Sequence, residues 1–306
     1  MSVLPTGYDA EQIAPPHLET APIHFRAILA ATDLSEQATT ALKIAAQAAH
    51  HFRSRLQVVY AVMPEFYMAD TTVLSPELQK VDLERAQHEL HEYTRRIPEV
   101  RTTMHEEIAV FGPAVDVIEA LARTAGIDLL VMGSHGHGAA RKLVLGSVAE
   151  SVIRNTHCPV LVAGPHCKPR LLPLKSIVLA TNLPAASLRA AQYATSLTRQ
   201  FGGTLTVVHV LRGDAGEGTI SSASTRRELR ELVPDDPELK HHVHFQVRSG
   251  EAAQEVVRIA KRSKADLIVM GAHEHSTLAD HAPWTTLSHV IRESPCPVLA
   301  VQPHFA

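Results

Sequence analysis

The chain has 306 residues, of which 45% are hydrophobic and 20% are charged, and its formal net charge is −3. This length and composition suit two globular domains, each with a core of its own, and they exclude a disordered protein. Lysine and arginine total 29 against 32 acidic residues, without a dense basic run, so a nucleic-acid partner is not expected. No apolar stretch approaches the roughly 20 residues of a membrane helix, and the first residues lack the basic start and apolar centre of a secretory signal. We therefore expect a cytoplasmic protein that does not contact a membrane.

The amino-terminal part of the chain predicts an extension followed by a first domain. Residues 1–24 contain several prolines and no regular pattern, so we expect a flexible extension there. From residue 25 to residue 164, apolar runs alternate with helical patterns, and a longer helical region is expected around Pro76 to Arg96. The strands of this domain are expected near Ala27–Thr32, Leu56–Val62, Thr102–Val110, Asp128–Met132 and Val160–Ala163.

A polar, proline-containing linker, residues 165–174, leads into a second copy of the same unit, residues 175–306. Ile28–Leu34 recurs as Ile177–Leu183 at an offset of 149, and Asp128–Gly133 recurs as Asp266–Gly271 at an offset of 138. The second copy is therefore 11 residues shorter between its second and third strands. We expect a mobile surface loop at Gly213–Gly218. The strands of this copy are expected near Ser176–Thr181, Leu205–Leu211, Val243–Arg248, Asp266–Met270 and Val298–Val301.

The alternation of strands and helices predicts the fold class. Strand and helix follow each other through both copies, which indicates an α/β fold made of two tandem, doubly wound, Rossmann-like domains, each with a five-stranded parallel sheet. The run Leu129–Met132 has no polar face, which fits a strand covered on both sides. Ligands of such sheets gather at the carboxyl ends of the strands, so the residues that follow each strand are the candidates for function.

A glycine-rich segment directly follows the strand expected at 128–132. Gly133 and Gly136 are followed, after nine further residues, by Gly146 and Ser147. Glycines let backbone N–H groups approach an anion without a Cβ in the way, and Gly146-Ser147 is expected to open a helix whose unpaired N–H groups attract phosphate. Ser147 is suited either to cap that helix or to bind a phosphate oxygen. The segment therefore predicts a phosphate cradle.

With this motif and its flanks, the chain resembles the universal stress protein family in a tandem, two-domain form. The ATP-binding members of that family carry G-x2-G-x9-G-[ST], and here the motif is complete. The resemblance runs from about Phe25 to Val301, and it includes Ala31-Thr32-Asp33 at the end of the first strand. It implies that the first domain binds ATP, with or without Mg²⁺. The implied nucleotide-binding residues are Ala31, Thr32, Asp33, Ala61, Met132, Gly133, His135, Gly136, Gly146, Ser147 and Val148.

The same resemblance implies a role for several of these residues. Asp33 would contact the ribose, and the backbone of Ala61 would hold the adenine edge. Members of the family often have valine at the position of Ala61, a change that a backbone contact tolerates. Gly133 would lie on the ribose side. The phosphates would be held by Gly136, Gly146, Ser147 and Val148.

The residues by themselves leave two alternatives open. A carboxylate just beyond the first strand could accept the hydroxyl groups of a ribose, but Asp33 or Ser35 could instead serve to start the following helix. We favour the ligand role, because two strand ends converge on one crevice. Arg141 and Lys142, within the nine-residue span, either screen phosphate charge or form an exposed basic pair.

The second copy departs from the motif at each of these places. Glu274 puts a negative charge where a phosphate would lie, and Trp284 fills the volume of the anion. We therefore expect that the second domain does not bind ATP in this manner. The replacements are Asn182 for Asp33, Glu274 for Gly136, Trp284 for Gly146 and Thr285 for Ser147.

The 20 histidines and three cysteines raise the question of a metal site. A metal needs three or four converging ligands, which His273, His275 and a distant side chain could supply. We favour solvent-facing loop histidines, because the spacing is not that of a helix or strand. The cysteines show no C-x-x-C spacing, so we expect buried thiols and no metal. We expect solvent-facing side chains also for His135, His137, His241, His242, His244, His281 and His289.

The leading functional hypothesis is an ATP-binding, non-motor stress-response protein. The first domain would sense or store a nucleotide, and the second would be a structural or regulatory partner. No G-x-x-x-x-G-K-[ST] loop and no evident general base occur, so we expect no catalytic residues and at most slow hydrolysis. The alternatives are a slow ATP hydrolase, and a metal- or small-molecule-binding module in the second domain. Dimers of this family commonly pair their last strands, so the tandem chain is expected to form an intramolecular pseudo-dimer, and a further homodimer is compatible with this.

Overall fold

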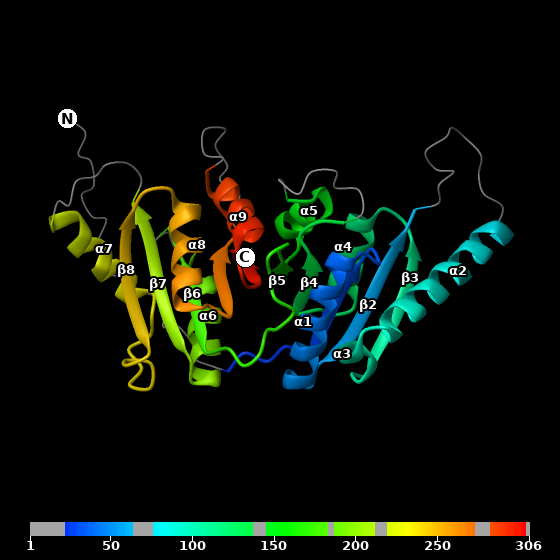
Figure 1. Ribbon diagram of the computed structural model, residues 1–306, viewed down its shortest axis with the longest axis horizontal. Helices are drawn as coiled ribbons and strands as arrows, with labels where there is room; N and C mark the ends of the chain where they lie inside the picture. The colour runs from blue at the N-terminus through cyan, green and yellow to red at the C-terminus, as the bar shows by residue number, and fades with distance from the viewer. Residues whose placement is uncertain are drawn as a thin grey trace, which may run out of the picture.

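The computed structural model describes residues 22–63, 76–136, 145–182, 187–211, 219–272 and 282–303 (Figure 1). The extension expected at 1–24 and the loop expected at Gly213–Gly218 lie almost wholly outside these residues. The first copy occupies the right of Figure 1 and the second copy the left. No helix within the described ranges combines the length and the apolar character needed to cross a bilayer.

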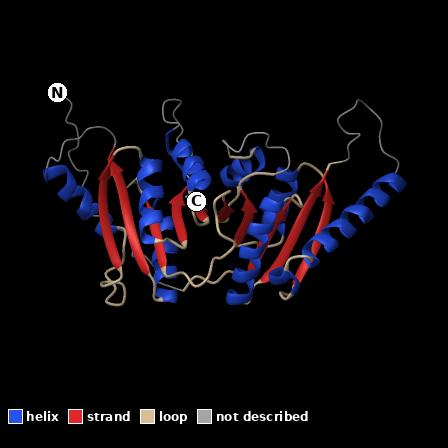
Figure 2. Ribbon diagram, viewed as in Figure 1, coloured by secondary structure: helices blue, strands red, loops and turns tan. Residues whose placement is uncertain are grey.

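Each copy alternates strands and helices as the sequence predicts (Figure 2). The first copy consists of β1 (Ala27–Thr32), α1 (Glu36–Phe52), β2 (Arg55–Val62), α2 (Pro76–Arg95), α3 (Pro98–Arg101), β3 (His105–Phe111), α4 (Ala114–Thr124), β4 (Leu129–Gly133), α5 (Ser147–Asn155) and β5 (Val160–Ala163). The second copy consists of β6 (Ser176–Ala180), α6 (Leu188–Phe201), β7 (Thr204–Leu211), α7 (Thr219–Glu231), β8 (Val243–Ser249), α8 (Ala252–Ser263), β9 (Leu267–Gly271), α9 (Ala282–Glu293) and β10 (Val298–Val301).

Most strand limits agree with the sequence expectation to within one residue, and the third strand is the exception. It was expected from Thr102, but β3 begins at His105. Pro98 opens the short helix α3, and the backbone N–H of Thr102 donates to the carbonyl of Pro98, so this stretch turns before the strand begins. The 11-residue difference between the copies falls where expected, because β3 begins 50 residues after the start of β2, whereas β8 begins 39 residues after the start of β7.

The described strands form one continuous sheet in the order β3-β2-β1-β4-β5-β10-β9-β6-β7-β8. Within each copy all strand pairs are parallel, as expected for doubly wound domains. The two copies join through β5 and β10, which pair antiparallel, with Leu161 opposite Leu299. The last strands of the two copies therefore pair within one chain.

Helices cover both faces of this sheet, and each covered face runs through both copies. On one face the buried residues of α1, α2, α3, α6 and α7 form a cluster with alternate strand residues such as Ile28 and Ile177. On the other face α4, α5, α8 and α9 pack against strand residues such as Leu29 and Val178. The expectation of a separate core for each domain is wrong in this respect, because antiparallel pairing of β5 with β10 makes the apolar faces continuous.

The joint between the copies is approximately symmetric. Gln302, just beyond β10, donates its side-chain N–H to the carbonyl of Ile153 on α5 at 2.6 Å. The equivalent residue of the first copy is Gly164, and a Cβ there would overlap the carbonyl oxygen of Ile291 on α9. A backbone segment of each copy thus lies directly against a helix of the other.

Candidate functional site

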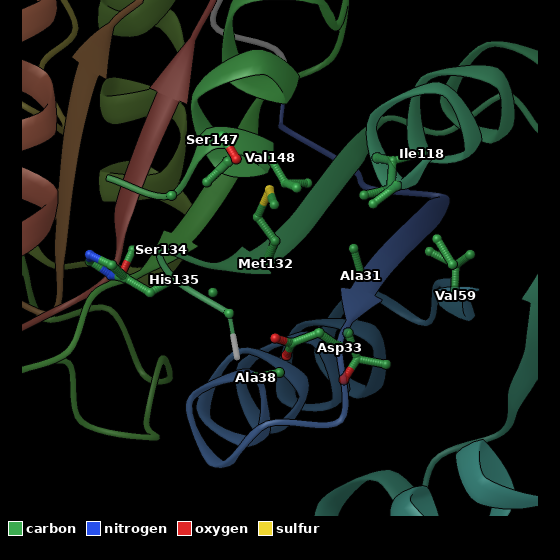
Figure 3. Close-up of a pocket in the computed structure, with 17 residues that line it drawn as sticks. Ala31, Asp33, Ala38, Val59, Ile118, Met132, Ser134, His135, Ser147 and Val148 are labelled. Carbon is green, nitrogen blue, oxygen red and sulfur yellow. The ribbon is translucent and has the colours of Figure 1, made fainter. Parts of the chain in front are cut away.

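A cavity of about 560 Å³ opens at the carboxyl ends of β1 and β4 (Figure 3). The order β3-β2-β1-β4-β5 reverses direction between β1 and β4, which is the point where sheets of this type bind their ligands. All eleven candidate residues from the sequence line this one cavity, namely Ala31, Thr32, Asp33, Ala61, Met132, Gly133, His135, Gly136, Gly146, Ser147 and Val148. Six lining residues were not foreseen, namely Ala38, Val59, Ala114, Ile118, Ser134 and Ala149.

The sequence could have identified some of these six residues but not others. Ser134 lies inside the glycine motif and could have been named from its position alone. Ala114 and Ile118 lie one helical turn apart on α4, where the spacing is that of an ordinary core face. Only the crossover that brings α4 over β2 and β1 shows that this face also borders the cavity.

One side of the cavity is apolar. Ala31, Val59 and Met132 point into it from β1, β2 and β4, and each is at most 8% exposed. Ile118 from α4 and Val148 from α5 lie around the same side in Figure 3. This part of the wall suits a flat, weakly polar group.

Asp33 lies on the opposite wall from Ser147 and Val148 (Figure 3). It belongs to a tight turn in which Leu34 has a φ of 64°, a left-handed conformation that is uncommon for a leucine. The Thr32 hydroxyl oxygen accepts the N–H of Leu34 at 3.0 Å, and the Asp33 Oδ1 accepts the N–H of Ser35 at 3.1 Å. Ser35 caps α1, because its Oγ accepts the N–H of Ala38 at 3.1 Å. Of the two alternatives, the capping role therefore belongs to Ser35, and Asp33 stabilises the turn.

The backbone of Gly136 lies directly against the Asp33 side chain. A Cβ at Gly136 would overlap the Oδ2 of Asp33, so glycine is needed here for close approach. The carboxylate and the glycine motif therefore meet at the mouth of the cavity.

The amino-terminal end of α5 forms the remaining wall. Gly146 is the cap residue, it has no side chain to accept the first N–H groups of the helix, and its own N–H donates to the carbonyl of Ser134 at 2.8 Å. Ser147 is the first helical residue, so the suggestion that it caps the helix is wrong. The first turn of α1, in contrast, is satisfied by Ser35. Of these two helix ends at the cavity, α5 is the one whose first N–H groups are left for a ligand.

Comparison with known proteins decides the family. The sequence profile of the universal stress protein family matches residues 24–164 and 173–302. The chain belongs to the universal stress protein family. A universal stress protein from Methanocaldococcus jannaschii is 32% identical over 139 residues, which are 45% of this chain and 81% of that protein. Another from Thermus aquaticus is 34% identical over 141 residues, which are 45% of this chain and 98% of that protein.

The fold of this universal stress protein also matches solved structures over its length. The crystal structure of a universal stress protein from Archaeoglobus fulgidus aligns with a TM-score of 0.66 and 22% identity. The alignment covers 90% of this chain and 98% of that chain, so both copies and their arrangement have a counterpart among known folds.

The second universal stress protein domain differs from the first in its backbone at the equivalent place. By the offset of 138, Thr285 corresponds to Ser147, yet α9 already begins at Ala282. The position of Gly146 therefore lies within the first turn of the helix in the second copy, and not at its cap. Asn182, which replaces Asp33, accepts a hydrogen bond from Ser187 at 3.1 Å. Glu274 lies outside the described residues.

The histidines divide into two groups. His241, His242 and His244 are exposed, as expected, whereas His135 is only 6% exposed, and its Nδ1 lies 2.8 Å from the Ser134 hydroxyl. The expectation of a solvent-facing His135 is wrong, because the chain stays in the packed region after β4, where the N–H of Ser134 donates to the carbonyl of Ala163 at the end of β5. Within the described ranges no group of three or more His, Cys, Asp or Glu side chains is arranged to hold a metal. His137, His273, His275, His281, Arg141 and Lys142 lie outside the described residues.

The three cysteines are buried thiols. Burial raises the pKa of Cys158 to about 11 and the pKa of both Cys167 and Cys296 to about 12. Thiols with such pKa values are not nucleophiles at neutral pH.

Proposed function

We propose that the first copy binds ATP and that the second copy is its structural or regulatory partner. The observation that carries this proposal is the pairing, across one cavity at the switch point of the sheet, of a carboxylate with a helix end that lacks a side-chain cap. A volume of about 560 Å³ is in the range of small-molecule sites, roughly 300–1,000 Å³. The site is also the one that carries the complete family motif.

The apolar side of the cavity would take the adenine. Ala31, Val59, Ile118 and Met132 offer packing surface to a flat ring. Their side chains provide no hydrogen-bond donor, so recognition of the base edge would fall to the backbone of Ala61 at the end of β2. Asp33 would accept the ribose hydroxyl groups through the oxygen that faces Gly136.

The amino-terminal end of α5 would take the phosphates. Gly136 and Gly146 present backbone without a Cβ, and the first N–H groups of α5, with Ser147 among them, would donate to phosphate oxygens. The helix dipole adds a favourable field for negative charge at this end. If Mg²⁺ accompanies ATP, it would neutralise part of the phosphate charge.

Sensing or storage of the nucleotide fits the cavity better than rapid hydrolysis. Asp33 is the one carboxylate among the described lining residues, and one of its oxygens is held by the N–H of Ser35. It is therefore placed to bind a ribose rather than to activate a water molecule near a terminal phosphate. A bound nucleotide would act through its different affinities for two states of the protein.

Calorimetric titration of the full chain with ATP, AMP, GTP and adenosine tests the proposal. We expect saturable binding of one ATP per chain, with weaker binding of adenosine because it lacks the phosphates. A second equivalent ATP, or no heat for any adenine nucleotide up to millimolar concentration, would contradict it. Analysis of nucleotide after long incubation with Mg²⁺ would separate storage from hydrolysis, because intact ATP is expected.

A further inference from the structure

A tyrosine from α2 reaches the turn that carries Asp33. The Tyr93 hydroxyl donates to the carbonyl oxygen of Ser35 at 2.7 Å and lies 2.9 Å from the Thr39 hydroxyl oxygen. Ser35 is the residue whose N–H holds the Asp33 carboxylate. A chain of hydrogen bonds therefore connects Tyr93, through one residue, to the carboxylate at the cavity.

The turn itself needs such support. Leu34 has a φ of 64°, and a leucine stays in this conformation only when its surroundings hold it there. The bonds from Thr32 and Asp33 act within the turn, whereas the bond from Tyr93 comes from a different element. Tyr93 thus fixes the turn relative to the rest of the first copy.

Tyr93 is itself held firmly. The residues on either side of it along α2, His91 and Thr94, both bond to Glu107 on β3, at 3.0 Å and 2.5 Å. Burial raises the pKa of the Tyr93 hydroxyl above its ordinary value of 10.0, so the group is a neutral donor at physiological pH. The last turns of α2 therefore present the hydroxyl from a fixed place.

The second copy lacks the residues that make this connection. The helix α7, which corresponds to α2, contains no tyrosine, and by the offset of 149 the residues at the places of Ser35 and Thr39 are Pro184 and Leu188. The support thus occurs in the copy that has Asp33 and is absent from the copy that has Asn182.

We propose that Tyr93 is a positioning residue, which orients Asp33 toward the ribose hydroxyl groups of the bound nucleotide. This inference rests on the proposed function. The longer α2 of the first copy is then part of the nucleotide site, although it does not line the cavity.

The test compares ATP with 2′,3′-dideoxy-ATP, which lacks the hydroxyl groups that Asp33 would accept. In the wild-type protein we expect ATP to bind more tightly than the dideoxy nucleotide. Tyr93→Phe removes only the hydroxyl, and it should weaken ATP roughly fivefold and leave the dideoxy nucleotide unchanged. Tyr193→Phe, which removes a tyrosine hydroxyl from α6, should change neither affinity.

An Asp33→Ala background completes the experiment. There Tyr93→Phe should have no further effect on ATP, because the group that it positions is gone. If Tyr93→Phe weakens both nucleotides equally, or neither, or if the effect persists without Asp33, the positioning role is wrong while ATP binding stands. If the wild-type protein binds the two nucleotides equally, the ribose contact proposed for Asp33 and the positioning role proposed for Tyr93 are both wrong. If it binds neither, the proposed function fails as well.

Discussion

Gly146 offers the sharpest test of where the phosphates bind. The change Gly146→Trp copies Trp284 of the second copy into the first. Gly146 has φ −63° and ψ 144°, a conformation open to any residue, so the backbone is not strained by a side chain. A Cβ would lie 3.0 Å from the carbonyl oxygen of Ser134 and 3.5 Å from the Cα of His135. The neighbours must therefore yield by a few tenths of an ångström, at a cost of at most about 3 kcal/mol.

The loss of ATP affinity is a separate effect, because it concerns binding and not folding. An indole at the cap of α5 would block the first N–H groups of the helix. Hydrogen bonds to charged groups contribute roughly 1.5–3 kcal/mol each, so the loss of two such bonds corresponds to about 3–6 kcal/mol. ATP should therefore bind between about 150-fold and about 20,000-fold more weakly. Adenosine should bind nearly as before, because it lacks the phosphates that the first N–H groups of α5 would bind.

Titration calorimetry with ATP and adenosine measures the two affinities, and thermal unfolding of each variant measures its stability. Trp284→Gly is the matched control, and it should leave the affinity for ATP unchanged, since the second copy is not expected to bind it. A folded Gly146→Trp protein that binds ATP like the wild type would refute the reasoning, because the phosphates would then lie elsewhere.

Three further predictions concern the fold. Burial by itself would raise the pKa of Glu107, but hydrogen bonds from Thr94, His91 and His105 outweigh burial and lower this pKa below its ordinary value of 4.5. Glu107→Gln should therefore lower the free energy of unfolding in urea by about 1–3 kcal/mol at pH 7. That difference should be present above pH 4.5 and shrink as the pH falls through the lower pKa of the folded state, and a constant difference down to pH 3 would contradict it. Gly164→Ala places a Cβ against the carbonyl of Ile291, so we expect a loss of about 1–3 kcal/mol in the same assay, and an unchanged midpoint would mean that the joint between the copies adapts freely. Cys158, Cys167 and Cys296 should react with a thiol reagent only after unfolding, and fast labelling of the native protein would show that they are more accessible than the structure indicates.

The sequence by itself determined the elements and their repetition. Strands such as Ala27–Thr32 and Val160–Ala163 were predicted with their observed limits, because hydrophobic periodicity and chain-breaking residues act locally. The eleven candidate site residues could also be named, since each lies at or just beyond the carboxyl end of a strand or belongs to the motif that the chain shares with the family.

Other features depend on contacts between residues distant in the sequence, which no local pattern records. The antiparallel pairing of Leu161 with Leu299 makes one sheet of two, and the crossover of α4 brings Ile118 to the cavity. The early start of α9, which places Trp284 inside a helix, likewise became visible only in three dimensions. The hydroxyl of Tyr93 meets Ser35 from 58 residues away. The sequence motif indicated which residues are candidates for nucleotide binding, and only packing between elements decided how those residues are held, because packing depends on residues far apart in the chain.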